Sequence, residues 1–315
     1  MMSIVVPVFG NASSIEALVD ALVDLDRELG GEIEVVFVVD GSPDDSYGLL
    51  HRRLSQTRLD AQLILLARNF GSFPAIHAGL AAGRGDLFAV MTADLQEPPD
   101  LMKRFREALA SDACDVVVGR RLCREDPLLG RLASRAFWGL YRRFVQPEVS
   151  PGGVDVFGLT RPVRDQIVGL CEHHSSLVGL LFWVGFRREE VLYRRQARAS
   201  GKSAWTLRKK LAYLTDSVFS FTDLPIKVLF RIGVAGLLFS MIFGALVLGA
   251  RLFGAISVPG YSATVLVVAF FGALNCLGLG IIGGYIWRTF ENTKGRPNYI
   301  VASRLTFGPG ERRVG

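Results

Sequence analysis

Along residues 1–120, apolar and polar positions alternate as strands and helices do in an α/β protein. Continuous apolar runs rich in β-branched residues predict strands at 3–9, 33–40, 62–67, 87–92 and 116–120. Apolar residues at helical spacing, or runs of small residues, predict helices at 14–29, 44–54, 74–82 and 101–110. Continuously apolar strands separated by helices are typical of a mainly parallel sheet covered on both faces.

Two longer apolar segments follow, at residues 232–250 and 263–287, and neither contains a charged side chain. At about 1.5 Å per residue, each can span a hydrocarbon core of roughly 30 Å. Basic residues flank the outer ends of both segments: Lys227, Arg231, Arg288, Lys294, Arg296 and Arg304. We therefore predict a transmembrane hairpin at 226–290 with both of its ends in the cytoplasm.

The second span is rich in glycine, at Gly272, Gly278, Gly280, Gly283 and Gly284. Small residues let helix backbones approach closely in a membrane. This pattern favours packing within the hairpin or between copies of the chain, and so makes a homo-oligomer one expected assembly.

Basic residues interleaved with aromatic ones predict two interfacial helices, at 127–145 and 203–225. Such helices suit a membrane surface, where arginines meet lipid phosphates and rings lie at the headgroup level. An ordinary packed helix with a solvated basic side is the alternative. The arginine-rich segment 187–198 is expected to be a flexible basic loop leading to the second helix. Nucleic-acid binding is disfavoured, because these basic segments border apolar runs of membrane length.

Composition changes this picture little. The chain has 315 residues and a net charge of +6, enough for one large globular domain with an appendage. We expect a cytoplasmic α/β domain at 1–225, the hairpin at 226–290 and a cytoplasmic tail at 291–315. No signal peptide is expected, since a strand-like run follows Met1 directly. The cysteines, Cys114, Cys123, Cys171 and Cys276, show no metal spacing and predict buried or idle thiols in a reducing compartment.

Candidate chemistry concentrates at residues 91–100, where a buried strand leaves the sheet. Thr92, Asp94, Gln96 and Glu97 supply hard oxygen ligands, which suit Mg²⁺ or Mn²⁺ holding a diphosphate. A polar turn with a proline-capped helix start is the alternative. Ligands bind at the carboxyl ends of strands in open α/β sheets, so this loop is the first candidate site.

Three further polar segments accompany it. Asp40-Gly41-Ser42 and Arg68-Asn69-Phe70-Gly71 each follow a predicted strand and are expected at the same sheet edge. Asp155, just after two glycines in an apolar stretch, is either a site residue or the cap of a helix or turn.

Together these segments resemble the family 2 glycosyltransferases that load a sugar onto polyprenyl phosphate, such as the dolichyl-phosphate mannose synthases and the bacterial undecaprenyl-phosphate glucosyl and aminoarabinosyl transferases. The resemblance covers nearly the whole chain. It rests on Val6-Pro7-Val8, Asp40-Gly41-Ser42, Arg68-Asn69-Phe70-Gly71, Ala78-Gly79-Leu80, Gly85-Asp86, Ala93-Asp94-Leu95-Gln96-Glu97-Pro98-Pro99, Gly153-Val154-Asp155, Arg198-Ala199-Ser200-Gly201-Lys202-Ser203, Tyr285-Ile286-Trp287-Arg288 and Arg296-Pro297-Asn298-Tyr299-Ile300-Val301.

The resemblance implies a GT-A fold and an inverting transfer of a hexose-type sugar from a nucleotide-sugar, UDP-linked by expectation, to undecaprenyl phosphate at the bacterial inner membrane. It implies a set of donor-binding residues: Pro7, Asp40, Asn69, Ala93 and Asp94. It implies Mg²⁺ or Mn²⁺ at Asp94 and Gln96, with Asp94 and Asp155 as catalytic residues. Arg131, Arg135, Arg198 and Lys202 are the candidates for gripping the lipid phosphate.

The chain departs from the family pattern at two positions, where Thr92 replaces the first acid of the metal loop and Val39 stands beside Asp40. The loss of one carboxylate is expected to weaken metal binding or to shift it to Glu97, water and phosphate. Two alternatives therefore stay open: transfer to a glycan or glycolipid hydroxyl, and an inactive membrane-anchored homologue. For Asp40, capping of the next helix is the alternative to base recognition.

Overall fold

The computed structural model describes residues 1–122, 139, 141–143, 154–170, 172, 176–195, 215–219, 221–253 and 261–308. The four residues predicted to bind the lipid phosphate, Arg131, Arg135, Arg198 and Lys202, lie outside these ranges. Most of the two predicted interfacial helices, 127–145 and 203–225, does so as well.

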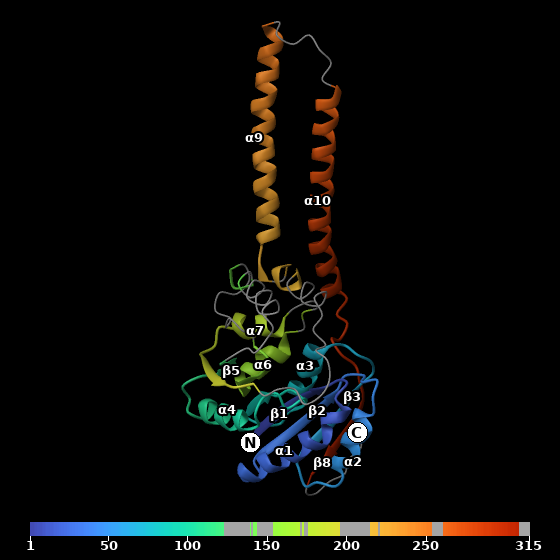
Figure 1. Ribbon diagram of the computed structural model, residues 1–315, viewed down its shortest axis with the longest axis vertical. Helices are drawn as coiled ribbons and strands as arrows, with labels where there is room; N and C mark the ends of the chain where they lie inside the picture. The colour runs from blue at the N-terminus through green and yellow to red at the C-terminus, as the bar shows by residue number, and fades with distance from the viewer. Residues whose placement is uncertain are drawn as a thin grey trace.

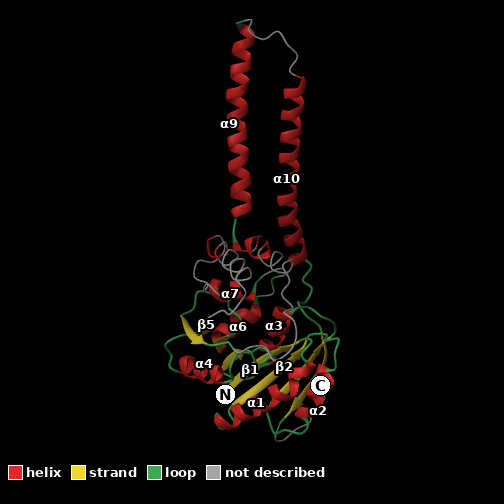
Figure 2. Ribbon diagram, in the orientation of Figure 1, coloured by secondary structure: helices red, strands yellow, loops and turns green. Residues whose placement is uncertain are grey.

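The sheet-containing part of the chain folds as strands and helices in alternation (Figures 1 and 2). Its strands are β1 (Met2–Val8), β2 (Ile33–Val39), β3 (Ala61–Leu66), β4 (Leu87–Val90), β5 (Val116–Arg121), β6 (Phe157–Thr160), β7 (Arg188–Tyr193) and β8 (Val301–Phe307). Its helices are the short 3-10 turn η1 (Ala12–Ser14), α1 (Ile15–Glu28), α2 (Ser46–Leu54), α3 (Ser72–Ala82), α4 (Asp100–Ala110), α6 (Arg161–Gly169) and α7 (Leu177–Trp183). The predicted α/β class is confirmed.

Some boundaries differ from the predicted ones. Helix α3 begins at Ser72, two residues before Pro74, because proline fits the first turn of a helix, where no backbone N–H is needed. The segment predicted as a flexible basic loop contains strand β7, so that prediction is wrong for these residues. In β7 the buried Val191 and Tyr193 alternate with the exposed Glu190 and Leu192, which is the pattern of a half-buried strand.

One sheet of eight strands has the order β7-β5-β6-β4-β1-β2-β3-β8. Strand β1 pairs in parallel with β2 and β4, β2 with β3, and β5 with β7. Strand β6 runs antiparallel to both β4 and β5, and β8 runs antiparallel to β3. Six strands therefore point the same way, and their carboxyl ends meet at one edge of the sheet.

Both faces of the sheet are covered. Buried residues of α1, α2 and α4 pack on one face around Val6 and Phe37. Residues of α3, α6 and α7 pack on the other face around Val5 and Val38. Burial on both sides explains why the central strands read as uninterrupted apolar runs.

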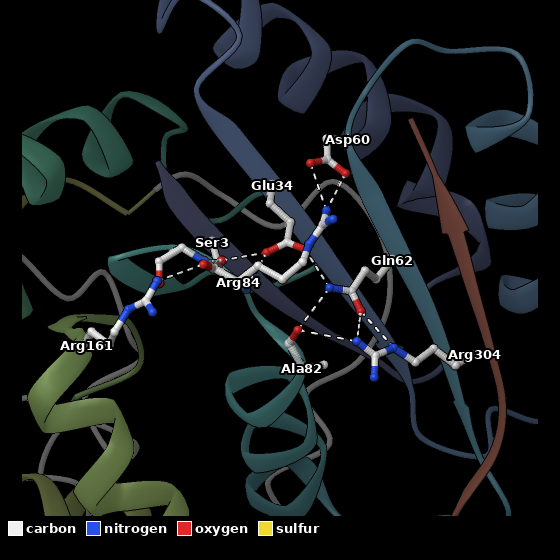
Figure 3. A network of polar contacts seen from close by, with 9 residues as sticks. Ser3, Glu34, Asp60, Gln62, Ala82, Arg84, Arg161 and Arg304 are labelled. Carbon is white, nitrogen blue, oxygen red and sulfur yellow. Dashed lines mark hydrogen bonds and ion pairs between the residues drawn. The ribbon is translucent and has the colours of Figure 1, made fainter. Parts of the chain in front are cut away.

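The chain returns to this domain after the apolar helices, since β8 pairs with β3 through residues such as Gln62 and Thr306. The sequence analysis predicted only a tail at 291–315. Figure 3 shows the contacts at this edge: Arg304 donates to Gln62 Oε1 at 2.6 and 2.9 Å, and Gln62 donates to the fully buried Glu34. Glu34 also accepts from Ser3 Oγ at 2.7 Å and from the Arg84 Nε at 2.6 Å. This network joins the amino ends of the strands, opposite to the candidate site.

Helices α9 (Leu224–Leu252) and α10 (Tyr261–Thr293) extend away from the sheet domain side by side (Figure 1). They contain the predicted spans 232–250 and 263–287. Large apolar side chains stand exposed on them, including Phe239, Met241 and Leu246. By length and composition, both helices can cross a membrane.

Candidate functional site

The loop between β4 and α4 holds the candidate metal ligands. Thr92 Oγ1 lies 2.8 Å from Asp94 Oδ1 and within hydrogen-bond distance of Glu97 Oε2. The Gln96 N–H donates to Asp94 Oδ1 at 3.4 Å, and Leu95 adopts a left-handed backbone conformation with φ of 53°. The tight turn draws the side chains of Thr92, Asp94 and Glu97 into one cluster.

Glu97, within this loop, is fully buried. Burial raises its pKa above the ordinary value of 4.5, a hydrogen bond with Thr92 opposes the shift, and the charge of Asp94 adds to it. The hydroxyl of Thr92 has one proton and can donate to only one carboxylate at a time. A protonated Glu97 that donates to Thr92 while Thr92 donates to Asp94 would satisfy both contacts.

Two arginines place positive charge near this cluster, and both oppose the rise in the pKa of Glu97. Arg195, two residues after β7, contacts Gln96 Oε1, and its Nε lies 3.8 Å from Glu97 Oε1. Arg121, the last residue of β5, forms an ion pair with Asp155 and donates to the buried Tyr193 hydroxyl at 3.3 Å. Asp155 precedes β6, which runs the opposite way, and so it lies at the same sheet edge.

The sequence analysis identified Asp94, Gln96 and Asp155 but missed Arg121, Arg195 and Tyr193. Each of these three follows or ends a strand that points toward the site. A strand prediction for 188–193 would have placed Tyr193 and Arg195 at the carboxyl edge.

On the other side of the site, Asp40 shapes the loop that carries Asn69. Its carboxylate accepts hydrogen bonds from the Phe70 and Gly71 N–H groups at 2.7 and 2.8 Å. Burial raises the pKa of Asp40, and these two hydrogen bonds oppose the rise. The alternative prediction that Asp40 caps the next helix is wrong, because both bonds go to the segment before α3. Asn69 itself is exposed.

Asp44 instead holds the start of α2. It accepts from Ser46 Oγ at 2.6 Å and from the Ser46 N–H at 3.2 Å, and it binds the Ala12 N–H at 2.9 Å. Burial opposes ionisation, but hydrogen bonds from Ser42, Ser46 and Ala12 lower the pKa of Asp44 to about 2. This carboxylate therefore ties the loops after β1 and β2 together near Pro7.

Gly41 allows the loops after β2 and β3 to touch. Its φ is +55°, and a Cβ at this position would lie 2.4 Å from the backbone of Arg68 and Asn69. Only glycine fits such an approach. Farther along the edge, Ser14 Oγ lies 2.9 Å from the Ala93 carbonyl oxygen. The loops after β2 and β3 are thus in direct contact, and residues 10–14 link the loop after β2 to the loop after β4.

The side chains at this edge fit a divalent cation shared with a phosphate group. Asp94, Gln96 and Glu97 offer carboxylate and amide oxygens, and the buried Glu97 Oε1 has no hydrogen-bond donor. Over the described ranges, no cluster of three or more His, Cys, Asp or Glu residues forms a closed metal site. Mg²⁺ is commonly held by one or two carboxylates with substrate phosphates and water, and this donor set suits that mode.

At the foot of α10, part of the second predicted interfacial helix is described. Arg288 forms an ion pair with Asp216 at 2.7 Å and lies 5.0 Å from the centre of the Phe219 ring. The Tyr285 hydroxyl donates to the Thr222 carbonyl oxygen at 3.2 Å. These contacts join Asp216, Phe219 and Thr222 to the end of the apolar helix nearest the sheet domain.

Residues 3–169 match the model of the family described as Glycosyl transferase family 2. The chain belongs to this family. CsbB of Bacillus subtilis (strain 168), named as a glycosyltransferase, is 31% identical over 301 residues, which are 96% of this chain and 91% of CsbB. The bactoprenol glucosyl transferase of Shigella phage SfX is 30% identical over 305 residues, which are 96% of this chain and 99% of the phage protein.

The fold of this glycosyltransferase is also found in solved structures. A glucosyl-3-phosphoglycerate synthase from Mycobacterium tuberculosis superposes with a TM-score of 0.51 at 18% identity, covering 69% of this chain and 80% of the other. The predicted GT-A fold and family 2 membership are both confirmed. The chain is a glycosyltransferase by family.

Proposed function

We propose that this glycosyltransferase transfers a hexose-type sugar from a nucleotide-sugar to polyprenyl phosphate, with inversion. The observation that carries the proposal is the full-length similarity to the phage bactoprenol glucosyl transferase. That similarity includes α9 and α10 as well as the sheet domain, so it extends beyond the family 2 model at 3–169. A lipid-linked acceptor accounts for both parts of the chain.

In the proposed reaction, an oxygen of the acceptor phosphate attacks the anomeric carbon of the sugar. A new C–O bond forms as the bond to the nucleoside diphosphate breaks, and the electron pair leaves with the diphosphate. The attacking phosphate is already an anion, so the step needs no strong general base. A hydroxyl acceptor would need one.

The residues of the site divide this work. The Asp40-bound loop carrying Asn69, together with Pro7 and Ala93, would hold the nucleotide. Asp94 and Gln96 would hold Mg²⁺ or Mn²⁺, which when bound neutralises charge on the leaving diphosphate. Asp155, fixed by Arg121, would orient the sugar or the acceptor.

The membrane location belongs to the same proposal. Two apolar helices with basic residues beyond their outer ends support a hairpin in the bacterial inner membrane, with the sheet domain and both termini in the cytoplasm. In this arrangement the site would lie near lipid headgroups and would be open to a cytoplasmic nucleotide-sugar.

The test uses the full chain in detergent with undecaprenyl phosphate and a panel of nucleotide-sugars, and identifies the product by mass spectrometry. A glycosylated polyprenyl phosphate is expected with one donor. The D94A and D155A variants should lose at least about a hundredfold in rate, as removal of transition-state contacts commonly does. Exposed Asp100 at the start of α4 provides the matched control D100A, which should retain activity.

Three outcomes would contradict the proposal. Sugar found on a hydroxyl acceptor would favour the direct-transfer alternative. An absence of turnover with every donor would favour the inactive homologue. Full activity of both D94A and D155A would refute the assignment of the site residues.

A further inference from the structure

The positively charged Arg195 contacts the side-chain oxygen of Gln96, which is also a proposed metal ligand. Its guanidinium contacts Gln96 Oε1, and its Nε lies 3.8 Å from Glu97 Oε1. The Gln96 and Glu97 side chains belong to the loop after β4, whereas Arg195 follows β7. The contact therefore joins two strands that are not neighbours in the sheet.

The chemistry of the two partners places the guanidinium in competition with a metal ion for this oxygen. A guanidinium carries only hydrogen-bond donors, and an amide oxygen offers its lone pairs to donors or to a cation. Gln96 is buried, which limits the directions from which its oxygen can be approached. Two positive charges at one oxygen also repel each other, although water screens part of this repulsion because the Arg195 side chain is 32% exposed.

The charge balance of the loop points the same way. Thr92 contributes a neutral hydroxyl where the family pattern has an acid, so fewer negative charges attract a divalent cation. Arg195 adds a positive charge beside the carboxylate of the fully buried Glu97. A cation supplied by the chain itself thus compensates part of the charge that would attract a metal.

We propose that Arg195 competes with the divalent cation for Gln96, so that the metal and the nucleotide can bind only when the guanidinium moves off this oxygen. The inference rests on the donor site proposed above and assigns a positioning residue to it. Once displaced, the guanidinium lies beside the diphosphate or the acceptor phosphate, both of which arginine binds well. This competition lowers the affinity of the substrate-free enzyme for the metal. It also couples release of the metal to the renewed contact between Arg195 and Gln96.

The primary test measures Mn²⁺ affinity by electron paramagnetic resonance of free Mn²⁺, using the full chain in detergent with and without UDP. R195A should bind Mn²⁺ tighter than the wild type by roughly tenfold, within the range of coupled binding equilibria. The matched control is R194A, since Arg194 is an exposed arginine next in sequence, and it should change affinity less than about twofold.

Equal or weaker Mn²⁺ binding by R195A would overturn the proposal, and so would equal tightening by R194A, which would indicate a bulk charge effect. An absence of measurable binding in both the wild type and R195A would overturn it too. If R195A does not fold, R195Q keeps a long polar side chain without the charge and carries the same expectation.

A double-mutant cycle shows whether the effect passes through Gln96. In a Q96A background the R195A substitution should no longer tighten Mn²⁺ binding, because the contested oxygen is gone. The same tightening in both backgrounds would contradict competition at Gln96. These readouts need no acceptor, so loss of sugar transfer with the expected Mn²⁺ results would count against the proposed acceptor and not against Arg195.

Discussion

At the scale of single residues, Thr92 is the position where this chain departs most clearly from the pattern of the family it resembles. Its hydroxyl lies between Asp94 and Glu97 and can donate to one of them at a time. A carboxylate there would add an oxygen ligand for a cation but would also place a third acid in a cluster that already holds two.

The T92D substitution should therefore have two opposite effects. Mn²⁺ binding should tighten by about tenfold, since an added carboxylate is a strong ligand for a hard cation. Without metal, the free energy of unfolding should fall by about 1 kcal/mol because like charges repel. Titration with Mn²⁺ and thermal unfolding with and without the metal measure both effects. T92S, which keeps the hydroxyl, is the control, and weaker Mn²⁺ binding by T92D would contradict the prediction.

Glu97 predicts a dependence of stability on pH. Burial raises the pKa of Glu97 in the folded state above 4.5. Between pH 4.5 and the folded-state pKa, the folded chain therefore binds more protons than the unfolded chain. The contribution of Glu97 to stability is therefore present below about pH 4.5 and is lost as the pH rises through the higher folded-state pKa.

The E97Q variant removes this titration and keeps a hydrogen-bonding group beside Thr92. Its free energy of unfolding relative to the wild type should rise as the pH increases from 4.5. Thermal unfolding in detergent between about pH 4.5 and pH 8 measures the difference. A difference that stays constant, or that falls with increasing pH, would show that Glu97 is ionised throughout.

At the scale of elements, β8 decides how the end of the chain is held. Arg304 on this strand donates twice to Gln62 Oε1, and Gln62 in turn donates to the buried Glu34. The strand also covers the edge of β3, which would otherwise present unpaired backbone groups.

The R304A substitution should lower the free energy of unfolding by about 1–2 kcal/mol, because the buried Gln62 oxygen loses charged donors. Thermal unfolding of the full chain measures the change. Arg58 is exposed at the end of the α2–β3 connection, and R58A should stay within about 0.5 kcal/mol of the wild type. A loss as small for R304A as for R58A would show that the strand is held by backbone pairing alone.

At the scale of the whole molecule, the sheet constrains the two apolar helices. Strand β8 follows α10 and pairs with β3, which precedes α9 in the chain. The segments before α9 and after α10 must therefore lie on one side of any membrane that the helices cross.

Reporter fusions at the two termini test this constraint in cells. A fluorescent protein that folds only in the cytoplasm should fluoresce at both the N-terminus and the C-terminus, since paired helices return the chain to its starting side. A periplasmic reporter should be inactive at both positions. Opposite locations of the two termini would contradict the proposed hairpin.

The sequence by itself determined the features that depend on local pattern. Apolar periodicity marked the strands and helices of residues 1–120, because burial on two faces leaves uninterrupted apolar strands. Uncharged length marked the helices that became α9 and α10. Because parallel strands have their carboxyl ends at one edge of the sheet, the sequence also predicted that Asp40, Asn69 and Asp94 lie at that edge.

Only the tertiary structure decided which distant residues meet there. Arg195 is 99 positions from Gln96, and nothing in the spacing of either segment pairs them. The same holds for Arg121 with Asp155, and for β8 with β3, since strand partners far apart in sequence are chosen by packing and edge pairing. The local sequence pattern therefore identified the loops of the site, whereas long-range contacts determined which arginines lie beside its acidic and amide side chains.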